Sequence, residues 1–480
     1  MAHAEGTTVL RDRWAEGSKG AAMFSQRTLT MSREELDARH LHKIQELVHY
    51  AYKHSDLHRR VYDDAGVKPS DIRTWDDYYR RLPFTDKHDY VRDQERYGIA
   101  AQAVDDDLLS SYFHTTGTTG TYLHEVYSEY DILKMGTIYG YAWWDNGIRP
   151  GDSIFVCHNF GFWLGLWHMF WGARFFGLTI YTGGGMTTDE RLDAIVARRP
   201  TVLAGTPTYL LRLARRAQER NIDLVGGSVK FITAGGEPGL NIPVIRHALE
   251  DAWGAVGIDA YGLSEVGIAH LECGAHPGGV HVMEDAFHSF SVNSESMERV
   301  ADGEIGENVV TAYSHLAQPF IKYRTHDLVR RYENHVHGCG WTWAYLDGSV
   351  LGRTDFMITI KGINVYPSAV ENLVGEVPRL SHFYELHIDR HEGADRLLVK
   401  VEAEPLTPIG EHSVLAARLS DVLRSRIGVT IGVDVVAFES TQRYELKSRR
   451  IFDHRDPSER TRFSAASIAS PPSPIETGDQ

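Results

Sequence analysis

The chain has 480 residues and a formal net charge of -15. This length exceeds the size at which one hydrophobic core keeps growing, so two or more domains are expected. The negative charge argues against a protein that coats nucleic acid or an anionic membrane, because both require clustered positive charge. Three cysteines cannot supply a disulfide framework and no signal segment opens the chain, which predicts a cytoplasmic protein.

The N-terminal part of the chain is expected to begin with a flexible segment that leads into helices. Residues 1–30 are irregular and predict a flexible segment. Residues 31–66 carry apolar side chains at helical spacing, which predicts a helical lead-in. Glycines and an arginine interrupt the apolar stretch 160–179, so no membrane span is expected.

Between residues 150 and 270, short apolar runs alternate with helical patterns. The runs predicted to form strands are 153–157, 178–181, 201–204 and 230–234, and capped helices are expected at 190–199 and 209–220. This alternation predicts an α/β fold with buried parallel strands. Each turn from strand to helix is then a natural place for a ligand.

The pattern changes at Gly352, where shorter elements follow. A strand pair around 357–360, a helix from Pro367 and strands at 397–402 and 433–438 predict a small α+β domain. After residue 455 the chain is rich in Ser, Pro and Ala and too poor in apolar residues to pack. The expected organisation is a flexible segment 1–30, a large domain 31–351, a small domain 352–455 and a disordered tail 456–480.

A loop of Thr and Gly residues at 115–120 offers hydroxyls and backbone N–H groups with little steric bulk. Such a loop can wrap phosphate oxygens. It is not a Walker loop, because the Gly-Lys-Ser/Thr ending is absent. Taken alone, it fits a polar turn equally well.

A second motif, Tyr261-Gly262-Leu263-Ser264-Glu265, combines an aromatic ring with a carboxylate. The ring can stack on a base and the carboxylate can hold Mg²⁺ against phosphates. Asp327 can accept both hydroxyls of a ribose. Each of these acids also fits a surface or turn position when considered in isolation.

Together these segments resemble the adenylate-forming ligase superfamily, and within it the phenylacetate-CoA ligase branch. The resemblance runs from about Met31 to Arg455. The segments that carry it are 82–87 (Leu-Pro-Phe-Thr-Asp-Lys), 115–120, 205–208 (Gly-Thr-Pro-Thr), 235–238 (Gly-Gly-Glu-Pro), 261–265, 323–328 (Tyr-Arg-Thr-His-Asp-Leu), 352–355 (Gly-Arg-Thr-Asp), 361–367 (Lys-Gly-Ile-Asn-Val-Tyr-Pro) and 445–447 (Glu-Leu-Lys). The set is specific for the family and only weakly specific for the substrate.

The resemblance implies a two-step reaction. A carboxylate attacks the α-phosphate of ATP and releases pyrophosphate, and an acceptor then displaces AMP from the acyl-adenylate. By matching positions, the nucleotide would contact Thr115, Thr116, Gly117, Thr118, Thr119, Gly120, Gly236, Glu237, Tyr261, Gly262, Ser264, Asp327 and Arg353. Glu265 would bind Mg²⁺, Lys447 would bridge the carboxylate and the α-phosphate, and Asp355 would be the hinge of a mobile small domain. Without the resemblance, Lys447 would be taken for an ordinary solvated lysine.

Two of the three cysteines are flanked by histidines and glycines. Such segments fit a closed tetrahedral zinc site. Some members of the resembled branch carry Cys and His at matching places, and this resemblance suggests Cys273, His281, His337 and Cys339 as the ligands. Four protein ligands leave no open position, so such a site would be structural. The alternative is a pair of ordinary buried thiols with surface imidazoles.

Aromatic residues after the first predicted strand favour a flat apolar slot for an aromatic or cyclic acid. The residues expected to line it are His158, Phe160, Trp163, Gly185 and Gly235. Core packing is the alternative for each aromatic residue. The expected function is an ATP-dependent ligase that transfers the acyl group to coenzyme A. Two alternatives stay open: transfer to an amine or amino acid, and a binding module without turnover.

Overall fold

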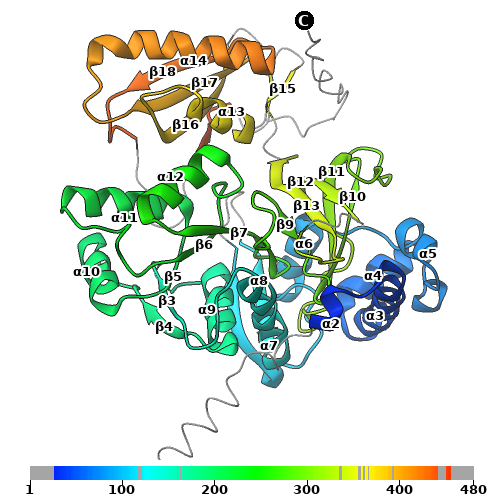
Figure 1. Ribbon diagram of the computed structural model, residues 1–480. Coiled ribbons are helices and arrows are strands. Elements are labelled where there is room, and N and C mark those ends of the chain that lie inside the picture. The colour runs from blue at the N-terminus through cyan, green and yellow to red at the C-terminus, as the bar shows by residue number, and fades with distance from the viewer. Residues whose placement is uncertain are drawn as a thin grey trace, which may run out of the picture.

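The computed structural model describes residues 26–115, 122–158, 160–162, 164–333, 338–354, 358–360, 363–365, 367–391, 394–441 and 450–455. Figure 1 shows a large body with a smaller C-terminal body above it. Across the described residues, no helix has the length and apolar character needed to cross a membrane.

An 11-stranded sheet organises the large body, with the order β10-β11-β12-β13-β9-β8-β7-β6-β5-β3-β4. The strands are β3 (Ser153–Val156), β4 (Thr179–Thr182), β5 (Val202–Gly205), β6 (Phe231–Gly235), β7 (Val256–Leu263), β8 (Ile268–Leu271), β9 (Val280–His281), β10 (Phe287–Val292), β11 (Ile305–Ala312), β12 (Tyr323–Tyr332) and β13 (Tyr345–Arg353). Strand β7 is parallel to β6 and antiparallel to β8, so it joins the parallel half of the sheet to the antiparallel half.

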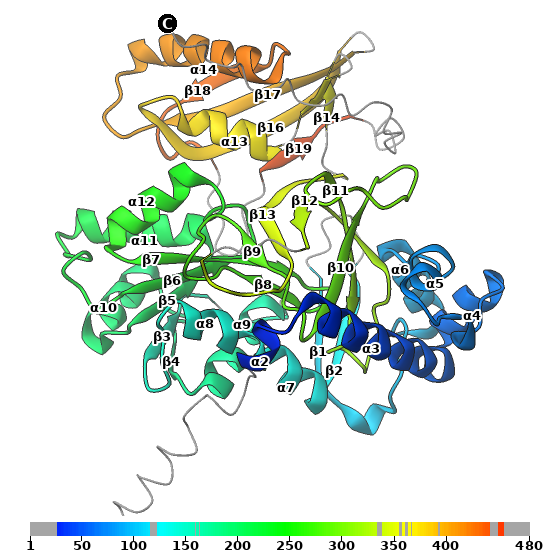
Figure 2. The ribbon, with the colours of Figure 1, turned by 45° about the vertical axis from the view of Figure 1, so that its right-hand side comes forward.

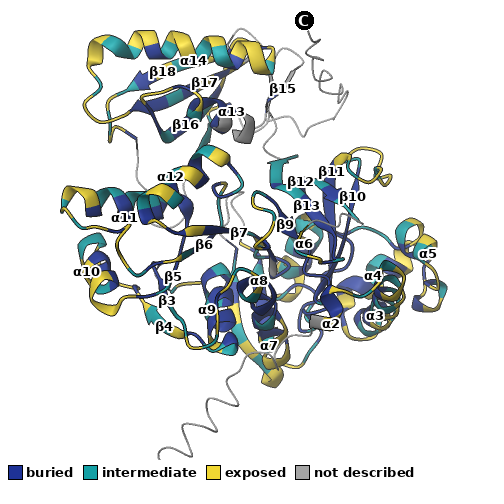
Figure 3. Cartoon of the chain, viewed as in Figure 1, coloured by how far each residue is buried: buried dark blue, intermediate teal, exposed yellow. Residues whose placement is uncertain are grey.

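Helices cover both faces of the parallel half. They are α7 (Glu129–Thr137), α8 (Tyr139–Asp145), α9 (Leu164–Phe176), α10 (Thr188–Arg198), α11 (Pro207–Glu219) and α12 (Pro243–Trp253). Because successive side chains of a strand point to opposite faces, Ile154 of β3 packs with Phe176 of α9. Its neighbour Phe155 packs with Leu210 of α11 on the other face. Strands β3, β5 and β6 are therefore largely buried, as Figure 3 shows by their dark colour, whereas the edge strand β4 is partly exposed.

The N-terminal helices pack against the antiparallel half. They are α2 (Gln26–Leu29), α3 (Arg33–His54), α4 (Asp56–Asp64), α5 (Trp75–Arg80) and α6 (Lys87–Tyr97), with short 3-10 turns η2 (Pro69–Asp71) and η3 (Asp106–Leu108). Leu47 and Val48 of α3 join Phe290 and Val309 of the sheet in one core cluster. Ser55 ends α3 and its hydroxyl caps α4, which divides the predicted helical lead-in into two helices.

Two antiparallel strands, β1 (Leu109–His114) and β2 (His124–Ser128), form a hairpin whose connecting loop contains the Thr/Gly motif. Thr115 and Leu123 close the described ends of this loop with two hydrogen bonds. The Thr115 N–H donates to the Leu123 carbonyl at 2.9 Å, and the Leu123 N–H donates to Oγ1 of Thr115 at 3.0 Å. Residues 116–121 lie outside the described residues.

The small body has its own four-stranded sheet, with the order β18-β17-β16-β19. Its elements are β14 (Ile358–Ile360), β15 (Ile363–Val365), α13 (Pro367–Gly375), β16 (Leu380–His391), β17 (Ala394–Ala403), η4 (Ile409–Glu411), α14 (His412–Ile427), β18 (Gly432–Val436) and β19 (Ile451–Asp453). Leu419 and Leu423 of α14 pack on Val399 and Val401 of β17. The predicted α/β class with a smaller second domain is confirmed, while the domain boundaries at 31, 351 and 455 stay predictions.

The two bodies touch along α12 and α11, as Figures 1 and 2 both show for α12 and the small body. Gly375 at the end of α13 lies so close to Val244 of α12 that a Cβ there would overlap its side chain. The guanidinium of Arg215 on α11 lies 3.5 Å from the ring centroid of Phe438, beyond β18.

Candidate active site

Three of the predicted nucleotide-binding residues meet where the two halves of the sheet join. Tyr261 of β7 donates a hydrogen bond of 2.6 Å to Oδ2 of Asp327 on β12. Arg353 of β13 donates one of 2.6 Å to Oδ1 of the same carboxylate. Burial raises the pKa of Tyr261 well above its ordinary value, so the hydroxyl stays a neutral donor. Both oxygens of the Asp327 carboxylate are thus held by donors from two other strands.

Glu265 lies in the turn after β7, and its carboxylate is bound by a lysine from the first turn of α6. The Lys87 ammonium is 3.1 Å from Oε1 of Glu265. It also donates to Oγ1 of Thr115 at 3.4 Å, at the start of the Thr/Gly loop. The structure thus brings the predicted magnesium ligand and the predicted phosphate loop to one lysine. An ammonium at this point supplies positive charge that attracts anionic groups such as phosphates.

The other residues of the Tyr261–Glu265 motif shape the turn. Gly262 is exposed, and the Ser264 carbonyl accepts a hydrogen bond of 3.3 Å from the hydroxyl of Tyr127 on β2. The β1-β2 hairpin therefore supports the turn that carries Glu265.

The segment after β6 holds a backbone conformation that favours glycine. Gly236 has a φ of 88°, and a Cβ at Gly235 would overlap the carbonyl of Ala260 in β7. Glu237 accepts a hydrogen bond of 2.8 Å from the N–H of Thr208, in the first turn of α11. Its carboxylate therefore fixes the segment to a helix N-terminus, where negative charge is favourable.

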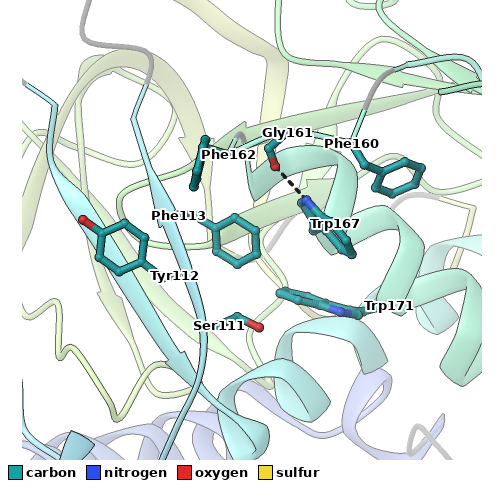
Figure 4. Close-up of a pocket in the computed structure, with 8 residues that line it drawn as sticks. All are labelled: Ser111, Tyr112, Phe113, Phe160, Gly161, Phe162, Trp167 and Trp171. Atoms are coloured by element: carbon teal, nitrogen blue, oxygen red, sulfur yellow. Dashed lines mark hydrogen bonds between the residues drawn. The ribbon is translucent and has the colours of Figure 1, made fainter. Parts of the chain in front are cut away.

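An aromatic pocket lies between β1 and α9 and has a volume of about 450 Å³. Its lining residues are Ser111, Tyr112, Phe113, Phe160, Gly161, Phe162, Trp167 and Trp171. Figure 4 shows the rings arranged around the cavity, with Trp167 donating to the Gly161 carbonyl at 2.8 Å. The Phe162 carbonyl accepts from the His114 N–H at 3.2 Å, which ties this segment to the strand before the phosphate loop. The pocket suits a flat apolar group.

Among the residues predicted to bind the acid, Phe160 lines this pocket, whereas His158, Gly185 and Gly235 do not. His158 is buried, and its Nε2 accepts a hydrogen bond of 2.7 Å from the Thr206 N–H at the start of α11. Burial lowers the pKa of His158 to about 4. This imidazole is therefore neutral at physiological pH.

Three of the four predicted zinc ligands come together. One ligand atom each of Cys273, His281 and Cys339 lies within 4.8 Å of the others. His281 donates from Nδ1 to the Trp343 carbonyl at 3.1 Å, which leaves Nε2, the usual metal-binding atom, 3.5 Å from Sγ of Cys339. Hydrogen bonds from Cys273 and from the Trp341 N–H lower the pKa of the Cys339 thiol. These donors match the chemistry of a zinc ion.

Comparison with known families decides what this arrangement is. The family model described as AMP-binding enzyme matches residues 29–315, and the model described as AMP-binding enzyme C-terminal domain matches residues 362–455. The chain belongs to the AMP-binding enzyme family. The predicted resemblance to adenylate-forming ligases is thereby confirmed.

Curated relatives of this AMP-binding enzyme include phenylacetate-coenzyme A ligases. That of Escherichia coli (strain K12) is 31% identical over 435 residues, which cover 89% of this chain and 97% of the relative. That of Aromatoleum evansii is 30% identical over 432 residues, covering 88% and 96%. The predicted similarity to the phenylacetate-CoA ligase branch is therefore confirmed as well.

Solved structures agree in fold. A crystal structure of 2-hydroxyisobutyryl-CoA ligase in the postadenylation state, in complex with R3-HIB-AMP, superposes with a TM-score of 0.84 at 25% identity, covering 90% of this chain and 92% of that one. The same ligase in the thioesterification state, in complex with 2-HIB-AMP and CoA, gives a TM-score of 0.68 over the same shares. The arrangement of the two bodies in this AMP-binding enzyme is thus closer to the postadenylation state.

Sequence reasoning missed several contributors to the site, among them one lysine and two tryptophans. Lys87 ends the segment 82–87, which served only to support the resemblance. Its role follows from contacts with residues that lie 28 or more positions away in the sequence. Trp167 and Trp171 stand one helical turn apart on an apolar helix, a spacing that could have indicated a shared face. Several predicted site residues lie outside the described residues: Thr116, Gly117, Thr118, Thr119, Gly120, Trp163, His337, Asp355 and Lys447.

Proposed function

We propose that this AMP-binding enzyme is an AMP-forming ligase that joins a flat aromatic carboxylic acid to coenzyme A. One observation carries the proposal. Two groups of side chains meet at the end of one strand, β7. In the first group, Asp327 accepts hydrogen bonds from Tyr261 and Arg353. In the second group, Glu265 is paired with Lys87, which also donates to Thr115. The first suits a ribose and the second suits Mg²⁺ and phosphates. The curated relatives named above are CoA ligases.

In the first step, the acid would attack the α-phosphate of ATP and release pyrophosphate. The protein would contribute positioning and charge neutralisation. Asp327 would accept the ribose hydroxyls, Glu265 would hold Mg²⁺ and Lys87 would face the phosphates together with the 115–120 loop. Gly236 and Glu237 would form the wall beside the adenine.

In the second step, coenzyme A would attack the acyl-adenylate and release AMP. The small domain would rotate about Asp355 between the steps, and Lys447 would serve the first step only. The closer superposition on a postadenylation structure supports a first-step arrangement for the form described here. Arg215 beside Phe438 and Gly375 beside Val244 are the contacts that such a rotation would break.

The aromatic pocket supports the class of acid. Its walls are six aromatic rings, two each from β1, from residues 160–162 and from α9, and Ser111 supplies a hydroxyl. Ring faces and edges of this kind favour a planar aromatic ligand over a branched aliphatic one. An amine or amino acid as acceptor is the second candidate, but the relatives and structures named above do not support it.

We also propose a structural zinc ion held by Cys273, His281, Cys339 and His337. The first three gather their ligand atoms and His281 has its second nitrogen fixed by a carbonyl, as metal-binding histidines usually do. The ion would fasten the segment after β8 to the segment before β13. No catalytic step depends on it.

The test is mass spectrometry of the products formed from ATP, Mg²⁺ and a panel of aromatic, arylacetic and aliphatic acids, with CoA and mixed amino acids present together. An aromatic acyl-CoA with one AMP for each thioester is the expected result. An acyl-amino acid would instead identify an amide synthetase. ATP binding without any AMP would indicate a module that binds the nucleotide without turnover.

A further inference from the structure

Glu125 on β2 is a buried acid that none of the proposed roles uses. Its relative exposure is 0%, and neither carboxylate oxygen has a hydrogen-bond partner among the residues that the structure describes. A buried carboxylate without a partner is costly, because it loses its hydration and gains nothing in return. Such a group at an active site calls for a function.

The hairpin directs Glu125 toward the Glu265 turn. Glu125 and Tyr127 share one face of β2, because alternate residues of a strand point the same way. The Tyr127 hydroxyl reaches the carbonyl of Ser264, the residue before Glu265. Consistent with this placement, burial and the Glu265 charge raise the pKa of Glu125, while the Lys87 charge opposes that rise.

The Lys87 ammonium contacts the Glu265 carboxylate, which the proposed magnesium site needs as a ligand. Its ammonium lies 3.1 Å from Oε1 of Glu265. A Mg²⁺ ion binds carboxylate oxygens at about 2.1 Å, and two cations that close to one oxygen repel each other strongly. When the ion binds, Lys87 must therefore give up part of its contact with Glu265. Within the part of the chain that the structure describes, the ammonium also contacts Thr115, and this contact is uncharged and longer, at 3.4 Å.

We infer that Glu125 is a positioning residue that holds Lys87 beside the phosphates once a divalent cation occupies Glu265. This inference rests on the proposed role of Glu265. A nearby divalent cation favours the ionised form of a carboxyl group. Glu125, on the strand that follows the 115–120 loop, can then supply the negative charge that Lys87 loses at Glu265.

The experiment measures Mg·ATP affinity and thermal stability for E125M, K87M and the double variant E125M/K87M. Methionine keeps the length of the side chain and removes the charge. We expect E125M to weaken Mg·ATP binding roughly 10-fold while its Tm without nucleotide equals or exceeds that of the unaltered protein. The double variant is expected to bind no more weakly than K87M, because both changes remove the same interaction.

Two further variants separate the possible failures. E129Q, at an exposed acid four residues along the chain, is the matched control and should bind Mg·ATP normally. If E265Q binds Mg·ATP as the unaltered protein does, the proposed magnesium site itself is wrong. If E265Q loses binding and E125M keeps it, or if the losses of E125M and K87M multiply, the role of Glu125 is refuted. Should E125M fail to fold, E125Q serves for the same comparison.

Discussion

Tyr261 and Asp327 share a hydrogen bond of 2.6 Å that links β7 to β12, two strands of one sheet with three other strands between them. Arg353 holds the other oxygen of Asp327 from the neighbouring strand. The carboxylate is therefore fixed from two sides before any nucleotide arrives. Preorganisation of this kind lowers the entropic cost of binding a ribose.

The first prediction concerns the charge of Asp327. In D327N, one acceptor oxygen is replaced by an amide N–H₂ that faces either Arg353 or Tyr261, both of which are donors. We expect the KM for ATP to rise roughly 10- to 100-fold, since hydrogen bonds to charged groups are worth about 1.5–3 kcal/mol. Steady-state assays that vary ATP at saturating acid measure this change.

D347N is the matched control, because Asp347 lies on β13 and is paired with Arg330 at 3.6 Å near the surface. A similar rise of the KM for ATP in D347N would contradict a specific role for Asp327.

The second prediction concerns the wall of the aromatic pocket. Phe162 is 59% exposed, so its removal should leave the free energy of unfolding nearly unchanged. We expect F162A to raise the KM for an aromatic acid roughly 3- to 10-fold, because an aromatic pair contributes about 0.5–1.5 kcal/mol. The KM for ATP should not change. Y97A, at an exposed tyrosine outside the pocket, is the control, and an unchanged KM for the acid in F162A would remove Phe162 from the binding site.

The sequence predicted the parallel half of the sheet well. Its strands are short, apolar on both faces and separated by capped helices, so local patterns contain the necessary information. The predicted runs 178–181, 201–204 and 230–234 each lie within one residue of β4, β5 and β6. The strand pair near 357–360 also appears, as β14 and β15.

The antiparallel half was not predicted from the sequence. Buried polar residues lie in or beside its strands β10 to β13, such as Glu307 in β11 and Lys322 directly before β12, and they break the alternation that identifies a strand. Glu307 is bound by Arg324 at 2.8 Å across neighbouring strands, and Lys322 donates to the Leu82 carbonyl at 2.6 Å. These partners are distant in sequence, so only the fold reveals why such residues are buried. The contacts of Lys87 and the position of Glu125 escaped prediction for the same reason.

The third prediction is a pH dependence of stability that comes from His158. Its pKa is lowered from 6.5 to about 4 in the folded protein, first by burial and then by the charge of Arg191. Because the folded-state pKa is below the unfolded value, the unfolded chain binds more protons than the folded protein between these two pH values. The contribution of His158 to the free energy of unfolding is therefore complete above pH 6.5 and is lost as the pH falls toward about 4. Protonation of Nε2 also removes the hydrogen bond from the Thr206 N–H.

The variant H158Q measures this contribution. A glutamine oxygen can still accept from Thr206 and does not titrate, so the loss of unfolding free energy on acidification should be smaller in H158Q than in the unaltered protein. Urea unfolding at neutral and at acidic pH provides the comparison. H42Q is the control, because His42 is exposed and should leave the pH profile as it is. Parallel profiles for H158Q and the unaltered protein would exclude His158 as a source of acid sensitivity.

The fourth prediction concerns the proposed zinc ion. The purified protein should contain about one zinc per chain, and C273S and C339S should each lose it, because three remaining ligands bind zinc much more weakly than four. We expect a strong chelator to lower the Tm by roughly 5 °C or more, since the ion would fasten two segments on different strands.

C157S is the control for this prediction. Cys157 is a buried thiol in another core cluster, so its replacement should leave the zinc content unchanged even if it lowers the Tm. A metal-free protein with both thiols reactive under denaturing conditions would contradict the zinc site. A loss of two thiols in a metal-free protein would instead indicate that Cys273 and Cys339, whose sulfurs lie within 4.8 Å, pair by oxidation.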